Sequence, residues 1–85
     1  AFHHFRDKDG YEVDIVIQRA GDEIAGVEVK AAATIGEKDF RGLKKLQAAA
    51  GKRFAAGVVI YDGEHTLPFG AGLFADPIRA LWEHP

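Results

Sequence analysis

The sequence predicts a small α/β fold of the α+β type. In this fold a three-stranded antiparallel meander is followed by a helix that crosses over to a further strand in one mixed sheet. Two tight-turn signals, Asp9-Gly10 and Ala20-Gly21-Asp22, divide the first third of the chain into three strand-like stretches. The apolar pattern then changes from a period of two to a helical period, and an apolar run follows. This order predicts a strand-helix-strand unit with two parallel strands.

The three expected strands of the meander occupy residues 1–6, 11–19 and 24–31. Side chains on a strand alternate between its two faces, so every second residue can face the core. The apolar residues expected to face inward are Val13, Ile15, Ile17, Val27 and Val29.

A helix is expected to begin near Thr34, because Thr34 and Glu37 have the spacing of a capping box. It is expected to end at Gly51, a residue typical of helix C-termini. Its apolar stripe consists of Phe40, Leu43, Leu46 and Ala50. Its outer face is basic and carries Lys38, Arg41, Lys44 and Lys45.

The last third begins with an apolar run, residues 54–61, which is typical of an interior strand. Residues 66–69 are expected to form a short strand, and Gly70-Ala71-Gly72 a loop. Asp76-Pro77 is expected to open a final helical turn, with proline at its first position. We find no repeat and no internal boundary, so residues 1–85 are expected to form a single domain.

Two charged triplets, Glu12-Val13-Asp14 and Glu28-Val29-Lys30, lie symmetrically about Gly21. If the turn is centred there, residues whose numbers sum to 42 face each other across the hairpin. Asp14 then meets Glu28 and Glu12 meets Lys30, all on one side of the sheet. A register shifted by one residue would separate the two sets.

The pairing of Asp14 with Glu28 is repulsive, and a divalent cation would relieve it. Mg²⁺ is typically bound by one or two carboxylates together with water and phosphate oxygens. The spacing therefore indicates metal-assisted phosphoryl chemistry with Lys30 beside the metal. The alternative is an ordinary solvated face, because mixed charges are common on the exposed side of antiparallel sheets.

Composition excludes several classes of protein. The chain has no cysteine, so disulfide frameworks, thiolate metal sites and thiol nucleophiles are excluded. No apolar stretch approaches the roughly 20 residues of a membrane helix, and no signal-peptide pattern is present. We therefore expect a cytoplasmic protein with no membrane partner. The formal charge of −2 gives no global basic signature, so a nucleic-acid contact would need a local patch.

In this order of elements, Asp14 and Glu28-Val29-Lys30 resemble the motif of the PD-(D/E)xK nuclease superfamily, also called the restriction-endonuclease-like fold. The run from Phe5 to Ile17 resembles a narrower branch, the nuclease-like C-terminal domain of unknown function of predicted bacterial and archaeal AAA-type ATPases. Further blocks extend this resemblance over nearly the whole chain: residues 28–30, 39–43, 60–64 and 77–82.

The resemblance implies that the chain is a C-terminal part of a larger ATPase. The superfamily core normally begins with a helix, and no such helix is expected before Phe2. The ATPase module with its phosphate-binding loop is also not in this sequence.

The resemblance further implies a metal-dependent endonuclease or exonuclease that hydrolyses DNA with Mg²⁺ or Mn²⁺. Asp14, Glu28 and Lys30 would be catalytic, and Asp14 and Glu28 would bind the metal, with Glu12 as an additional or alternative ligand. The metal would acidify a water molecule, and Lys30 would orient it and stabilise the phosphate charge. The basic helix face could contact DNA.

Two alternatives stay open. The first is a non-catalytic accessory domain that binds nucleic acid, a partner protein or its own ATPase module. The second is a homodimer formed through an exposed sheet edge. Gln47 lies late in the helix, where some relatives place a polar residue near the site, but we expect it to be an ordinary solvated residue. The four histidines lack a zinc spacing and are expected to be surface or packing residues.

Overall fold

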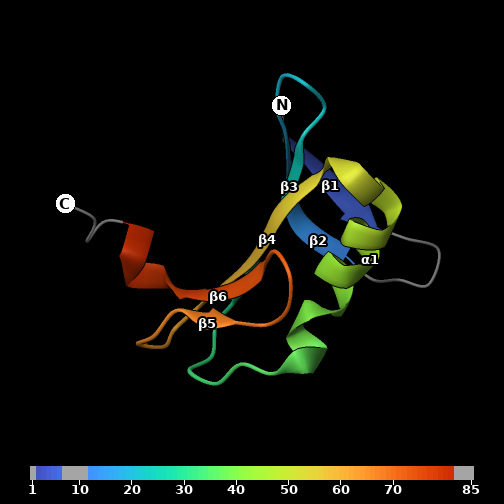
Figure 1. The fold of residues 1–85 in the computed structure, drawn as a ribbon. Helices are drawn as coiled ribbons and strands as arrows, with labels where there is room; N and C mark the ends of the chain where they lie inside the picture. Colours follow the sequence, from blue (N-terminus) through green and yellow to red (C-terminus); the bar gives the residue numbers. More distant parts are fainter. Residues whose placement is uncertain (1, 7–11, 82–85) are drawn as a thin grey trace.

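The described residues form a mixed six-stranded sheet with one α-helix on one side (Figure 1). The computed structural model describes the backbone of residues 2–6 and 12–81 and the side chains of residues 13–79. The strands are β1 (Phe2–Arg6), β2 (Glu12–Gln18), β3 (Ile24–Lys30), β4 (Phe54–Tyr61), β5 (Leu67–Pro68) and β6 (Leu73–Pro77). The helical segments are the 3₁₀ turns η1 (Glu37–Phe40), η2 (Gly51–Arg53) and η3 (Ile78–Leu81) and the helix α1 (Arg41–Ala50). The predicted Asp9-Gly10 turn lies outside the described residues.

The strand order is β1-β2-β3-β4-β6-β5. Strands β1, β2 and β3 form the predicted antiparallel meander, and β4 pairs with β3 in the predicted parallel orientation. The sequence did not predict β6, which pairs in parallel with β4 and antiparallel with the short β5. The expected helical turn beginning at Pro77 is wrong in its start, because Pro77 ends β6 and η3 begins at Ile78.

The turn between β2 and β3 has the predicted centre. Gly21 and Asp22 both adopt positive φ values, 88° and 65°, which a tight hairpin turn requires. The Arg19 amide donates to the Glu23 carbonyl at 3.0 Å, and the pairs from Ile15–Val27 to Gln18–Ile24 follow in order. Every one of these pairs sums to 42, so the predicted register is confirmed over this segment. The pairing ends at Ile15–Val27, so the predicted pairs Asp14–Glu28 and Glu12–Lys30 are not formed.

A bulge in β2 changes which of its side chains reach the core. His3 pairs with Val16, whereas Phe5 pairs with Val13, so Asp14 and Ile15 together lie opposite one residue of β1. Such an extra residue reverses the alternation of faces beyond it. Val13 and Val16 are buried, while Ile15 is 39 % exposed. The prediction that Val13 faces the core is confirmed. The prediction that Ile15 and Ile17 face it is wrong, because Val16 takes the inward position after the bulge.

The helix begins later than predicted. Gly36 precedes η1, and α1 starts only at Arg41, so Thr34 is not the cap residue. The Asp39 carboxylate accepts a hydrogen bond from the Gly36 amide at 2.8 Å and thereby caps η1. The predicted stop is confirmed, since Gly51 follows α1 with a φ of 59°. In the described part of the chain, no helix is long and apolar enough to cross a membrane.

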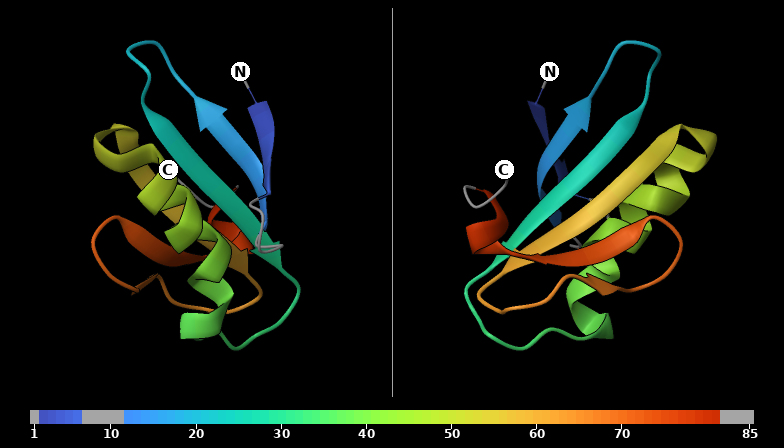
Figure 2. Two further views of the ribbon diagram at one scale, coloured as in Figure 1. Left: turned by 90° about the vertical axis from the view of Figure 1, so that its right-hand side faces the viewer. Right: turned by 60° about the vertical axis from the view of Figure 1, so that its left-hand side comes forward.

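The core lies between α1 and the face of the sheet that α1 covers (Figure 2). Leu43 and Leu46 project from α1 toward β3, where Gly26 leaves room for them. A Cβ atom at Gly26 would lie 2.7 Å from a methyl carbon of each leucine, closer than van der Waals contact allows. The absence of a side chain at this position therefore permits the close approach of helix and sheet.

The opposite face of the sheet carries exposed apolar side chains, and among the described segments only η3 lies toward one end of it (Figure 1). The exposed large apolar side chains of the described residues are Ile15, Val29, Phe74 and Ile78. The prediction that Val29 faces the core is wrong, because Val29 is 57 % exposed. Residue 29 lies an odd number of positions from Gly26 and therefore projects from the other face of β3.

We expect the Gly26→Ala substitution to lower the free energy of unfolding by about 1–3 kcal/mol, the usual cost of overpacking a filled core. Leu43 is fully buried and cannot move away freely. The matched control is Gly36→Ala, because a Cβ there would meet nothing within 4 Å and the φ of −149° suits any residue. Urea denaturation measures both, and equal stability of the two variants would contradict this account of the helix contact.

Candidate active site

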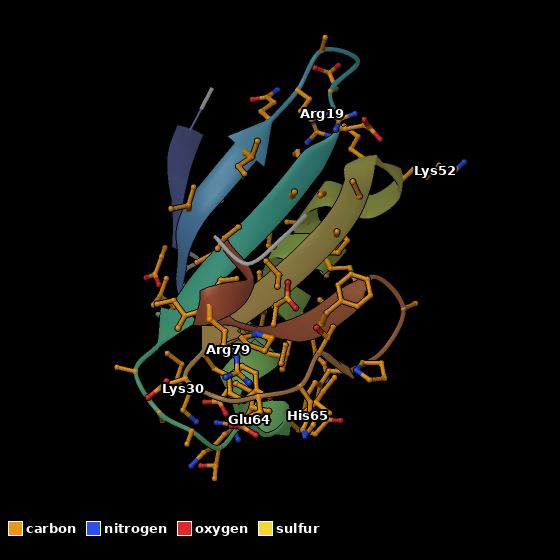
Figure 3. All side chains as sticks on the ribbon, turned by 90° about the vertical axis from the view of Figure 1, so that its left-hand side faces the viewer. Arg19, Lys30, Lys52, Glu64, His65 and Arg79 are labelled. Atoms are coloured by element: carbon orange, nitrogen blue, oxygen red, sulfur yellow. The ribbon has the colours of Figure 1, made fainter. Side chains whose placement is uncertain are left out.

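The predicted site residues lie at the end of the sheet where the parallel strands β3 and β4 terminate and β2 begins. Figure 3 shows Lys30, Glu64 and Arg79 toward this end and Arg19 and Lys52 toward the opposite end. Carboxyl ends of parallel strands commonly form ligand sites, because side chains from several strands and loops converge there. The described charged residues at this end come from β2, β3, η1, the loop after β4 and η3.

Asp14 is connected directly to the acid-x-Lys segment of β3. Its Oδ2 atom accepts a hydrogen bond from the backbone amide of Val29 at 2.9 Å. The backbone pairing of β2 with β3 ends one residue earlier, at Ile15–Val27. The Val29 amide lies just beyond the paired segment, where β2 offers it no backbone partner, and the Asp14 carboxylate accepts its hydrogen bond instead. This bond holds Asp14 against the residue between Glu28 and Lys30.

Glu28 and Lys30 share the face of β3 that α1 covers, since both lie an even number of residues from Gly26. In the parallel register Glu28 lies beside Val59 and Lys30 beside Tyr61. Val59 and Tyr61 are buried, so the two charged groups lie at the border of the core. Both Glu28 and Lys30 are half-buried.

The ammonium of Lys30 forms an ion pair with Asp39, a residue that the sequence motif does not include. The distance from Nζ to Oδ2 is 2.8 Å, and the two side chains are 28 % and 15 % exposed. The pairs Arg19–Glu23, Lys44–Glu37 and Arg79–Glu64 are far more exposed, for example Arg19–Glu23 at 70 % and 50 %. Asp39 lies within one of the blocks that carry the family resemblance, but spacing alone gave no reason to connect it with β3.

Asp39 has a pKa below the ordinary value for aspartate. Burial alone would raise this pKa, but the hydrogen bonds from Lys30 and the Gly36 amide, together with the positive charges of Lys30 and Lys38, lower it by more. Asp39 is therefore ionised at neutral pH, and its negative charge faces the Lys30 ammonium.

The third expected ligand, Glu12, starts β2, but its side chain lies outside the described residues. Among the described side chains, no group of three or more His, Asp or Glu residues converges in a way that could hold a metal ion. Mg²⁺ needs only one or two carboxylates from the protein. Asp14, which is exposed, and Glu28, which is half-buried, supply hard oxygen donors of the required kind.

The basic residues predicted to contact DNA, Lys38, Arg41, Lys44 and Lys45, are all exposed. They lie on η1 and α1, and Lys44 pairs with Glu37 at 2.7 Å. Gln47 is not simply solvated, because its amide donates to the Ala71 carbonyl at 2.9 Å and fastens the loop before β6 to α1. The basic side chains of the helix are therefore exposed to solvent, whereas Gln47 has a structural role in attaching the loop before β6.

The loop after β4 borders the site and is held by side-chain bonds. The Tyr61 hydroxyl donates to the His65 carbonyl at 2.6 Å, and Arg79 lies 3.7 Å from the Glu64 carboxylate. The Asp62 amide donates to the Ala32 carbonyl at 2.9 Å, which joins this loop to the segment after β3. The loops that follow β3 and β4 thus support each other beside Lys30.

These features define an α+β domain with a mixed sheet and a charged site at one end of it. The chain belongs to the family described as "Domain of unknown function (DUF4143)", whose model matches residues 1–81. This family is found in AAA-ATPase-associated proteins. The comparisons with curated proteins and with solved structures gave no match.

We expect the Lys30→Met substitution to raise the pKa of Asp39, because burial then acts against a weaker set of stabilising charges. A carboxyl group whose pKa is lowered by folding stabilises the fold at pH values above its unfolded pKa of about 3.9. This contribution to stability is lost as the pH falls through the pKa of the folded state. Carbon-detected NMR titration of the aspartate carboxyl groups measures the shift. The matched control is Lys52→Met at the opposite end of the sheet, and the same Asp39 pKa in all three proteins would contradict the ion pair.

Proposed function

We propose that this domain is a Mg²⁺- or Mn²⁺-dependent nuclease with a restriction-endonuclease-like core that hydrolyses DNA phosphodiester bonds. In the full-length protein it would lie C-terminal to an AAA-type ATPase in the cytoplasm. The observation that supports this most is the bond between the Asp14 carboxylate and the Val29 amide. It joins the acidic residue of β2 to the Glu28-Val29-Lys30 segment of β3, in the order that the nuclease motif requires.

In this proposal Asp14 and Glu28 hold the metal ion through their carboxylate oxygens, with Glu12 as a further candidate. When bound, the ion supplies Lewis-acid stabilisation of phosphate charge and lowers the pKa of a water molecule. Lys30 contributes a compact positive charge that hydrogen-bonds a phosphate oxygen or the attacking water. Hydrolysis breaks the P–O bond to the leaving sugar oxygen, and the water oxygen forms the new bond to phosphorus.

The exposed basic residues of η1 and α1 support a role in holding the DNA backbone. Lys38, Arg41 and Lys45 follow the same helical segment that carries Asp39, the partner of Lys30. A phosphate chain that reaches Lys30 would therefore meet further positive charge along this segment. Such contacts are independent of sequence and weaken as salt concentration rises.

We expect the Asp14→Ala and Lys30→Ala variants each to cleave DNA at least about 100-fold more slowly than the wild type, since each removes charge stabilisation at the phosphate. The assay follows cleavage of single-stranded, duplex and branched DNA with Mg²⁺ or Mn²⁺. Matched controls are Glu23→Ala and Lys52→Ala, which remove one negatively and one positively charged side chain at the opposite end of the sheet. Equal cleavage by wild type and both site variants, or cleavage by none, would rule out the nuclease.

The second candidate is a non-catalytic accessory domain that binds nucleic acid, a partner protein or the ATPase module, and that could also form a homodimer. The observation that favours it is the face of the sheet opposite α1, where Ile15, Val29 and Phe74 are exposed. Exposed apolar patches are typical of protein contacts. Metal binding separates the two candidates, because only the nuclease needs it.

We expect Mn²⁺ at millimolar concentration to broaden the NMR signals of Asp14, Glu28 and Val29 in the wild type before those of other residues, because a paramagnetic ion acts on nearby nuclei. The Glu28→Ala variant should lose this selective broadening, since it retains a single carboxylate of the described pair. Glu23→Ala should retain it. Uniform weak broadening in all three proteins would favour the accessory domain.

A further inference from the structure

A lysine ammonium at the end of a strand needs a partner if it is to act from a defined position. Its four-carbon stem has about 2 kcal/mol of rotamer entropy, so an unpaired ammonium samples many places. Lys30 is the last residue of β3, and the backbone beyond it turns at once, with the Ala32 amide bonded to the Lys30 carbonyl. The strand therefore determines where the stem begins but not where the ammonium lies.

Asp39 supplies that partner, and it is itself held in place from two sides. Its Oδ2 atom accepts hydrogen bonds from both the Lys30 ammonium and the Gly36 amide, each at 2.8 Å. The next residue, Phe40, is fully buried and stacks on Phe69 with ring centroids 4.5 Å apart. The position of the carboxylate thus follows from the core and from the cap of η1, without a contribution from any bound substrate.

The pair leaves Lys30 able to act. An ammonium group has three N–H donors, so the bond to Asp39 uses one and a phosphate oxygen can accept another. The pair is at the border of the core, with Lys30 28 % exposed, so the ammonium is partly desolvated yet accessible. The Asp39 side chain is the less exposed of the two, at 15 %. Lys30 is therefore the more accessible member of the pair to a phosphate.

We propose that Asp39 is a positioning residue of the nuclease site, which holds the Lys30 ammonium on the face of β3 shared with Glu28. This inference rests on the proposed nuclease function. Asp39 acts through Lys30 and makes no contact with the phosphate. The same carboxylate joins β3 to the start of the helical segment, so the position of the basic helix face and that of Lys30 are determined together.

Two substitutions separate positioning from capping. Asp39→Asn keeps a side-chain oxygen that can accept the hydrogen bond from the Gly36 amide, but it loses the negative charge that faces Lys30. Asp39→Ala loses both bonds and should also weaken the start of η1. We expect Asp39→Asn to unfold at a urea concentration close to that of the wild type and Asp39→Ala to unfold earlier.

The experiment compares Mg²⁺-dependent DNA cleavage by the wild type, Asp39→Asn, Lys30→Ala and the double variant. We expect kcat of Asp39→Asn to fall about 10-fold or more with KM nearly unchanged, because the ammonium loses its position and the DNA-binding face is intact. In the Lys30→Ala background the further Asp39→Asn change should have no effect, since Asp39 acts only through Lys30. Glu37→Gln, which removes another carboxylate of the same turn, should leave kcat unchanged.

The outcomes are distinct. If the wild type cleaves and Asp39→Asn cleaves at the same rate, the positioning role is overturned while the nuclease stands. A loss of kcat in Asp39→Asn that persists in the Lys30→Ala background would also overturn it, because the two changes would then act independently. A wild type that cleaves nothing overturns the nuclease itself and this inference with it.

Discussion

The close contact of α1 with β3 across Gly26 is the constraint on which the rest of the structure depends. Leu43 and Leu46 fill the space that a side chain at Gly26 would occupy. Gly57, which lies beside Gly26 on β4, makes room for Leu73 and, less closely, for Leu43. The helix therefore lies directly over the parallel pair β3–β4, and its N-terminal side reaches the carboxyl ends of those strands. Asp39 meets Lys30 at this point, so the helix contact that forms the core also completes the charged site.

The bulge in β2 connects the core with the same site. Because Asp14 and Ile15 together oppose one residue of β1, Val13 and Val16 can both reach the core although they are three positions apart. The regular pairing with β3 stops next to the bulge, and the Asp14 carboxylate bonds the Val29 amide beyond it. A strictly regular strand would have put Asp14 directly opposite Glu28, where like charges repel. The bulge instead places the Asp14 carboxylate against the backbone of the neighbouring residue.

Several elements follow from local signals that the sequence carries in full. The turn at Gly21 is one, because its two positive φ angles depend on residues adjacent in the chain and determine the hairpin register. The stop at Gly51 and the strand Phe54–Tyr61 are others. The start of the helix and β6 were not predictable in this way. Gly36 rather than Thr34 precedes η1, since Asp39 is drawn toward Lys30 and caps that turn, and β6 forms because β4 offers it a parallel partner.

The sequence by itself determined the meander, its register about Gly21, the crossover to β4, and the order in which Asp14, Glu28 and Lys30 follow one another. These features depend on turn residues and on apolar periodicity, which act between near neighbours in the chain. Only the tertiary structure decided the bulge at Asp14, the outward orientation of Val29 and the pairing of Lys30 with Asp39. Each of these depends on contacts between segments far apart or on which face of the sheet α1 covers. A periodic pattern marks two faces of a strand, but the packing of a helix selects the one that becomes the core.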